Sequence, residues 1–215
     1  MWLAHKRWYF CGWFESDGIF ANFADIWMIM FSFVKNSIRR RVLKGVEPFR
    51  GAKQEFPQID KISCLGVLCK VESIADVEAF GEMVQFLKGF GRLDGAVLEG
   101  KKCFRSSAAR TEFEEFCKAE NILFLSKRCA DWKGIPQNTA LADFYIQERD
   151  LMITLNPDID FTLDYIAARS ASHFTTAVHS SNMVPYNLVL EPGKDSLSFK
   201  EYVEKLLGYI GKMQQ

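Results

Sequence analysis

The chain has 215 residues, of which 48% are hydrophobic and 25% are charged, the balance of a soluble globular protein. It has 27 Lys and Arg residues and 27 Asp and Glu residues, so its formal net charge is zero. A general nucleic-acid-binding protein usually has a large excess of basic residues, so this balance argues against that class. The length suits one domain with an appendage, and it is large enough to bury a substantial core.

Residues 1–27 are crowded with aromatic side chains that follow no helical or strand period. Met28 and Met30 come directly after this segment. We favour an upstream start codon chosen in error, so that residues 1–27 are not part of the fold. The alternative is a membrane segment over Ile19–Val34, which is short for a spanning helix and contains Asp25.

Residues 28–57 predict a basic amphipathic helix followed by a linker. Phe31, Val34 and Ile38 recur at helical spacing. Five basic residues mark the candidate membrane-binding or partner-binding surface: Lys35, Arg39, Arg40, Arg41 and Lys44. Such a helix can lie on an anionic membrane surface, or it can dock on protein and leave its charges in water. Gly45–Gln58, which contains several glycines and prolines, has the composition of the linker.

The cysteines indicate a reducing compartment. Six are present: Cys11, Cys64, Cys69, Cys103, Cys117 and Cys129. No two of them form a CxxC pair, and the histidines do not supply zinc-ligand spacing. We therefore interpret them as reduced thiols of a cytoplasmic protein, most of them in the core, and we expect neither a bound metal nor a cofactor.

From residue 58 to the C-terminus, short apolar runs alternate with helical patterns. This alternation predicts an α/β domain of three layers, Rossmann-like and doubly wound, with a mostly parallel sheet of about five or six strands. The expected strands are Lys61–Val71, Leu93–Leu98, Ile122–Leu125, Leu151–Leu155, Phe174–Val178 and Tyr186–Leu190. We expect one of the last two to pair at the sheet edge.

Capping boxes predict where several helices begin. The three pairs are Ser73 with Asp76, Thr111 with Glu114, and Ser198 with Glu201. Two further helical patterns pass through Leu141 and Phe161. The helix that starts near Ser198 carries the widest apolar stripe in the chain, so we expect the domain to unfold without it.

In open parallel sheets, ligands bind beyond the carboxyl ends of the strands. The candidate ligand-binding residues at these positions are Ser73, Lys101, Trp132, Asn156 and Asp158. Backbone donors at helix N-termini there would suit a phosphate or a carboxylate. We favour the simpler interpretation that Ser73, Asp158 and Asp160 cap helices and that Trp132 closes the end of the core as a lid.

Three other sequence patterns do not indicate a metal site or a catalytic site. Asp158, Asp160 and Asp164 lack the further carboxylates and the glycine of an oxygen-ligand loop. His173 and His179 have no cysteine or serine motif nearby, so we interpret both as structural. No strand-to-helix turn carries a glycine-rich phosphate loop or a nucleophile elbow, and we assign no catalytic residue.

Five motifs carry a resemblance to known proteins: Asp131-Trp132-x-Gly134-x-Pro136, Asp150-Leu151-x-Ile153-x-Leu155, Tyr165-Ile166-Ala167-Ala168, Tyr186-Asn187-Leu188-Val189-Leu190 and Leu207-Gly208-Tyr209-Ile210. From Lys61 onward the chain resembles a family of small bacterial proteins known only as a domain of unknown function. The resemblance implies an α/β domain behind a basic N-terminal helix that starts near Met28 or Met30. It implies no activity and no catalytic residue.

A weaker similarity connects the strand at Asp150, its helix and Ser170-Ala171 to the N-terminal half-domain of heptose-type glycosyltransferases. The chain has no room for the second half-domain, which normally binds the donor nucleotide. Transferase activity by this chain alone is therefore not expected.

We expect a non-catalytic binding or interaction module that is cytoplasmic, with the basic helix as its means of reaching the inner membrane surface. The expected partner is a protein or an anionic membrane, and not a nucleic acid. The alternative is an enzyme of sugar-nucleotide or phosphate-ester type that uses the pocket at the strand carboxyl ends.

Overall fold

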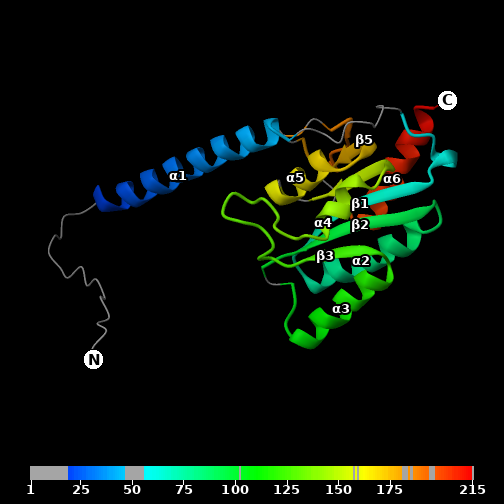
Figure 1. Ribbon diagram of the computed structural model, residues 1–215, viewed down its shortest axis with the longest axis horizontal. Coiled ribbons are helices and arrows are strands. Elements are labelled where there is room, and N and C mark those ends of the chain that lie inside the picture. Colours follow the sequence, from blue (N-terminus) through cyan, green and yellow to red (C-terminus); the bar gives the residue numbers. More distant parts are fainter. Residues whose placement is uncertain are drawn as a thin grey trace. The chain divides into compact units, whose positions relative to one another are not determined.

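The computed structural model, drawn in Figure 1, describes residues 19–46, 56–101, 103–156, 158, 160–180, 184, 186–193 and 197–214, with side chains from residue 28 onward. Of the sequence predictions, the segment before Ile19, Cys11 and the centre of the linker lie outside these residues. The chain divides into two compact units, Met1–Ser37 and Ile38–Gln215. Helix α1 (Ile19–Lys44) runs through the boundary between them.

The described strands form one open sheet of six strands, and every pair of neighbours is parallel. The order is β3-β2-β1-β4-β5-β6, so the winding direction changes between β1 and β4. This confirms the predicted doubly wound sheet, with β6 as the edge strand. The bounds are β1 (Cys64–Val71), β2 (Arg92–Glu99), β3 (Ile122–Leu125), β4 (Arg149–Leu155), β5 (Ser172–Ala177) and β6 (Leu188–Val189).

Helices cover both faces of the sheet (Figure 1). One face carries α2 (Ile74–Leu87), α3 (Ser107–Ala119) and α6 (Phe199–Lys212), and the other carries α4 (Leu141–Ile146) and α5 (Phe161–Arg169). Leu65 and Val67 of β1 face the larger core under α2, α3 and α6, and Leu68 faces the smaller core. Because both faces are buried, the strands read as nearly continuous apolar runs.

The helix starts agree with two of the three predicted capping boxes. Those confirmed are Ser73 with Asp76 at α2 and Ser198 with Glu201 at α6. The box at Thr111 and Glu114 is wrong, because α3 begins at Ser107 and is capped by Ser106. Thr111 lies inside the helix, where its hydroxyl donates to the Ser107 carbonyl at 3.1 Å.

Some strand ends also differ from the predictions. β1 begins at Cys64 because Ile59–Lys61 forms a short 3₁₀ turn, η1. β6 contains only Leu188–Val189, which pair with Thr176 and Ala177 of β5.

One ion pair crosses the sheet inside the core. The guanidinium of Arg149, which is fully buried, lies 2.5 Å from the carboxylate of Asp94 on β2. To reach Asp94 from β4, the Arg149 side chain passes over β1 at Gly66, which pairs with Asp94 in the sheet register. An added Cβ at Gly66 would meet the Cδ atom of Arg149 and the thioether of Met152. A glycine is therefore needed at position 66 to leave room for the Arg149 side chain, and not to form a turn.

Candidate functional site

The N-terminus of α2 lies at the carboxyl end of β1, where an anion would be expected to bind. The Asp76 carboxylate lies at this end of the helix and accepts hydrogen bonds from the backbone N–H groups of the two residues before it, Glu72 (2.8 Å) and Ser73 (2.9 Å). The Ser73 hydroxyl in turn accepts from the Asp76 N–H at 3.2 Å. Ser73 therefore caps the helix, as the simpler interpretation predicts, and it offers no donor pair to a ligand.

The carboxyl end of β4 lies beside that of β1 and carries charges that pair with each other. Lys70 of β1 is 2.6 Å from Glu72 and 3.3 Å from Asp160. Asp160 also caps α5 by accepting from the Thr162 N–H at 2.9 Å. Asn156 is buried here, and its Oδ1 atom has no hydrogen-bond partner among the described residues. Among the described residues, it is the predicted ligand residue with a buried polar atom that has no structural partner.

The remaining strand-end candidates are spread out. Lys101 and Asp158 are exposed, and Asp158 is not the cap of α5, because Asp160 takes that position. At the end of β2, the buried Glu99 carboxylate accepts from the Arg110 guanidinium and from the Lys127 N–H, each at 3.3 Å. The charges at this edge of the sheet mostly neutralise one another.

Trp132 lies on a loop with a fixed shape. One oxygen of Asp131 accepts from the N–H groups of Lys133, Gly134 and Ile135 at 2.9–3.0 Å. Gly134 has a φ of +96°, in the region that favours glycine. Ile135 packs inward, whereas Trp132 is 59% exposed, so the expectation that Trp132 forms a lid over the core is wrong.

The C-terminal end of α1 docks on this loop and on α5. Leu43 is buried in a small core that contains Phe161 and Tyr165. The Arg39 side chain donates to the Lys133 carbonyl at 2.8 Å, and its guanidinium lies 4.8 Å from the centre of the Phe161 ring. Burial lowers the pKa of Arg39, and nearby Asp160 partly offsets this. Arg39 therefore anchors the helix and is not available to a membrane.

The other basic residues of α1 face water. Arg40, Arg41 and Lys44 are exposed, and Lys35 is half-buried. Immediately before them, six large apolar side chains are between 49% and 74% exposed: Met28, Ile29, Met30, Phe31, Phe33 and Val34. Exposed apolar groups at this density usually mark a binding surface. In the part of the chain that the structure describes, no helix combines the length and hydrophobicity needed to cross a bilayer.

The polar residues of the resemblance motifs have structural roles. Asp131 shapes the Trp132 loop, as described above. Asp150 accepts from the N–H and hydroxyl of Ser63 and from the N–H of Cys64 at 2.7–3.0 Å, which joins β4 to the start of β1. The Asn187 side chain accepts from the N–H and hydroxyl of Thr175 at 2.8 and 2.9 Å. All three side chains therefore hold parts of the fold together.

Cysteine and metal chemistry find no support in the described residues. The five described cysteines form no disulfide with one another. Burial, with help from Glu99 and other nearby carboxylates, raises the pKa of Cys103 to about 11, and burial raises the pKa of Cys117 to about 12. Such thiols are poor nucleophiles at neutral pH. No three His, Cys, Asp or Glu side chains come together as metal ligands in this part of the chain.

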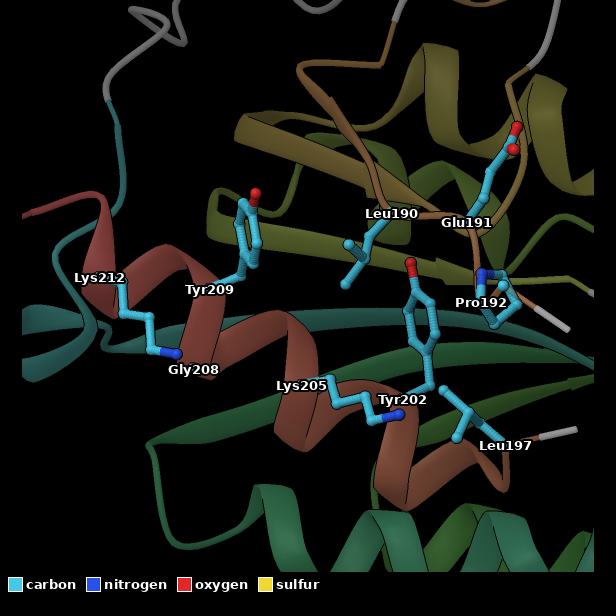
Figure 2. A pocket seen from close by; sticks show the side chains of 10 residues that line it. Leu190, Glu191, Pro192, Leu197, Tyr202, Lys205, Gly208, Tyr209 and Lys212 are labelled. Atoms are coloured by element: carbon cyan, nitrogen blue, oxygen red, sulfur yellow. The ribbon is translucent and has the colours of Figure 1, made fainter. Parts of the chain in front are cut away.

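A pocket of about 370 Å³ lies between α6 and the segment after β6. Figure 2 shows Tyr202 and Tyr209 rising from α6 toward Leu190 and Glu191. The Tyr202 hydroxyl already donates to the Ala177 carbonyl at 3.1 Å, so it is committed to the fold. No sequence pattern indicates this pocket, because its residue types are ordinary for an amphipathic helix beside an edge strand.

Residues 35–213 match the model of the Family of unknown function (DUF6913), which is well over half of the chain. The chain belongs to this family. The DUF6913 match includes the basic end of α1 and the whole α/β domain, and it begins after the exposed apolar residues 28–34.

No curated protein and no solved structure matches the chain. The DUF6913 match supports the resemblance to a domain of unknown function that the sequence motifs indicate. The weaker similarity to heptose-type glycosyltransferases and the bacterial origin receive no support from these comparisons.

Proposed function

We propose that this protein is a non-catalytic binding module that attaches to anionic membrane surfaces through α1. The observation that carries the proposal is the exposed apolar run at residues 28–34, followed within ten residues by the exposed cations Arg40, Arg41 and Lys44. Apolar side chains enter the boundary between headgroups and acyl chains, and cations next to them attract anionic lipids. At the carboxyl ends of the strands, most charged side chains pair with one another, which supports a role in binding rather than catalysis.

The Trp132 loop supports the same function. It contacts α1 directly through the bond between Arg39 and the Lys133 carbonyl, and it presents an exposed indole beside the Lys133 ammonium, which lies 5.4 Å from the centre of the ring. Tryptophan is suited to the membrane interface because one end of its ring is apolar and the other carries a polar N–H. We propose that Trp132 enters the headgroup layer next to the basic end of α1.

The setting we propose is the cytoplasm of a bacterium, at the inner face of the inner membrane. The absence of disulfides among the five described cysteines supports a reducing compartment. An anionic inner leaflet would supply the lipid charge that the cations of α1 require.

Reversing three charges on α1 is expected to weaken membrane binding strongly. In the full chain, the variant Arg40→Glu/Arg41→Glu/Lys44→Glu should bind vesicles that contain phosphatidylserine roughly 100-fold more weakly, since each cation near such a surface contributes about 1 kcal/mol. Trp132→Ala should weaken binding without changing its dependence on salt. Vesicle flotation measures both effects.

The matched control reverses three exposed charges elsewhere: Arg105→Glu, Lys118→Glu and Lys127→Glu. This variant has the same net charge as the α1 variant and should float like the original chain. Equal loss in both variants would show that only net charge matters. Unchanged flotation of the α1 variant would refute the proposal.

A second candidate function is an enzyme of sugar-nucleotide or phosphate-ester type that uses the strand carboxyl ends. One observation favours it: Asn156 is buried where the winding direction changes between β1 and β4, and its Oδ1 atom has no partner among the described residues. This function predicts a phosphorylated metabolite that co-purifies with the full chain in native mass spectrometry and is lost in Asn156→Leu. A mass spectrum that contains only the protein without a bound metabolite would count against this second function.

A further inference from the structure

An apolar groove of about 540 Å³ runs between α2 and α3. Its floor is formed by the aromatic rings of Phe104, Phe113 and Phe116, and Ile74 at one end is 43% exposed. Gly81 lies in its α2 wall, and an added Cβ there would meet nothing within 4 Å. The groove is therefore open space at the surface, and its glycine allows a neighbouring backbone to approach closely.

The rim of the groove is acidic. Glu78 and Glu82 stand one turn apart on α2, and Glu112 stands opposite on α3. All three are exposed, and none forms an ion pair with a described residue. By contrast, Glu114, two residues after Glu112 on α3, is paired with Arg110 at 3.2 Å. The unpaired rim favours an occupant with an apolar face and basic flanks.

A segment of the chain itself has this chemistry. Phe31, Val34 and Ile38 form a stripe along α1, and the first two are 63% and 49% exposed. At 3.6 residues per turn, Lys35 falls on one flank of this stripe and Arg41 on the other. A helix lying in the groove would thus bring one cation to each acidic wall.

We propose that α1 of a second copy of this chain binds in the groove between α2 and α3. A second copy is needed because the end of α1 packs on α5, which covers the sheet face opposite α2 and α3. Reciprocal exchange of α1 forms two such contacts and closes a twofold dimer. α1 held in the groove is withdrawn from lipid, so the dimer is the form detached from the membrane; this last consequence rests on the proposed function.

Sedimentation of the full chain over a wide concentration range tests the proposal. We expect a dimer whose dissociation constant rises roughly tenfold or more in Gly81→Trp, the effect of losing the centre of an interface. The matched control is Gly208→Trp on α6, where an added Cβ also meets nothing within 4 Å, and it should dimerise like the original chain. Far-UV circular dichroism and thermal unfolding show that both variants remain folded.

Charge exchange identifies the occupant. Lys35→Glu/Arg41→Glu should be monomeric, and so should Glu78→Lys/Glu82→Lys/Glu112→Lys. A mixture of the two should form heterodimers, because each then carries the complement of the other. A chain that is monomeric at every concentration, or a Gly81→Trp dimer as stable as the original, would overturn the inference. Either result leaves flotation by phosphatidylserine vesicles as a separate test of the membrane function.

Discussion

Replacing Arg149 by methionine is expected to lower the free energy of unfolding by about 3–5 kcal/mol. The change removes the partner of the buried Asp94 carboxylate and leaves that charge in the core. It also removes the bond from the guanidinium to the Gln147 carbonyl at 2.8 Å and the contact with the Phe144 ring at 3.8 Å. Urea unfolding followed by circular dichroism measures the loss.

Three further variants separate the charge from the packing. The matched control is Arg92→Met, two residues before Asp94 on β2. Arg92 is exposed, so this change should alter stability by about 0.5 kcal/mol at most. Gly66→Ala should cost about 1–3 kcal/mol by overpacking against Arg149. Removing both charges in Arg149→Met/Asp94→Leu should restore much of the stability. An Arg149→Met variant as stable as Arg92→Met would show that the ion pair has no structural role.

Removing α6 is expected to unfold the domain. Five of its side chains are buried: Tyr202, Val203, Leu206, Leu207 and Ile210. Each contributes about 1.5–3 kcal/mol of transfer free energy on burial, and together they approach the whole stability of a typical domain, about 5–15 kcal/mol. A chain that ends at Gly193 should therefore show no cooperative transition in thermal or urea unfolding.

A milder pair of variants tests the same helix in a folded protein. Leu206→Ala should lower the free energy of unfolding by about 2–5 kcal/mol, because it leaves a cavity in the larger core. Lys205→Ala, on the exposed side of the same turn, should change it by about 0.5 kcal/mol at most. A sigmoidal unfolding transition in the shortened chain would contradict the role given to α6.

The sheet could be predicted because its signals are local. The apolar runs of β1 and β4 and the capping box at Ser73 each lie within a few residues of sequence, and each predicts one element. The box at Thr111 failed for the same reason: Ser106 offers another start five residues earlier, and the tertiary fold decides between them. Element ends that depend on neighbouring strands, such as those of β6, could not be predicted locally.

The ion pair and the groove could not be predicted, because they depend on residues distant in sequence. Asp94 and Arg149 are 55 residues apart, and their contact also needs Gly66 on the strand between them. The groove combines two helices that each look ordinary alone. A signal was present in α2, where Ile74 is an apolar residue that the core does not use.

The strand-end candidates illustrate a further limit. Serine and aspartate before a helix suit both a cap and a ligand site, and only the position of the Asp76 carboxylate shows that Ser73 is a cap. For Trp132, sequence alone could not tell which residue of its loop faces inward; the structure shows that it is Ile135.

Hydrogen–deuterium exchange of the full chain, with and without vesicles that contain phosphatidylserine, tests the membrane-binding surface most directly. We expect slower amide exchange in α1 and in the loop at residues 131–136, and unchanged exchange at the strand carboxyl ends around Asn156. Vesicles without anionic lipid should have no effect. Binding to vesicles with slower exchange elsewhere and none in α1 would contradict this expectation.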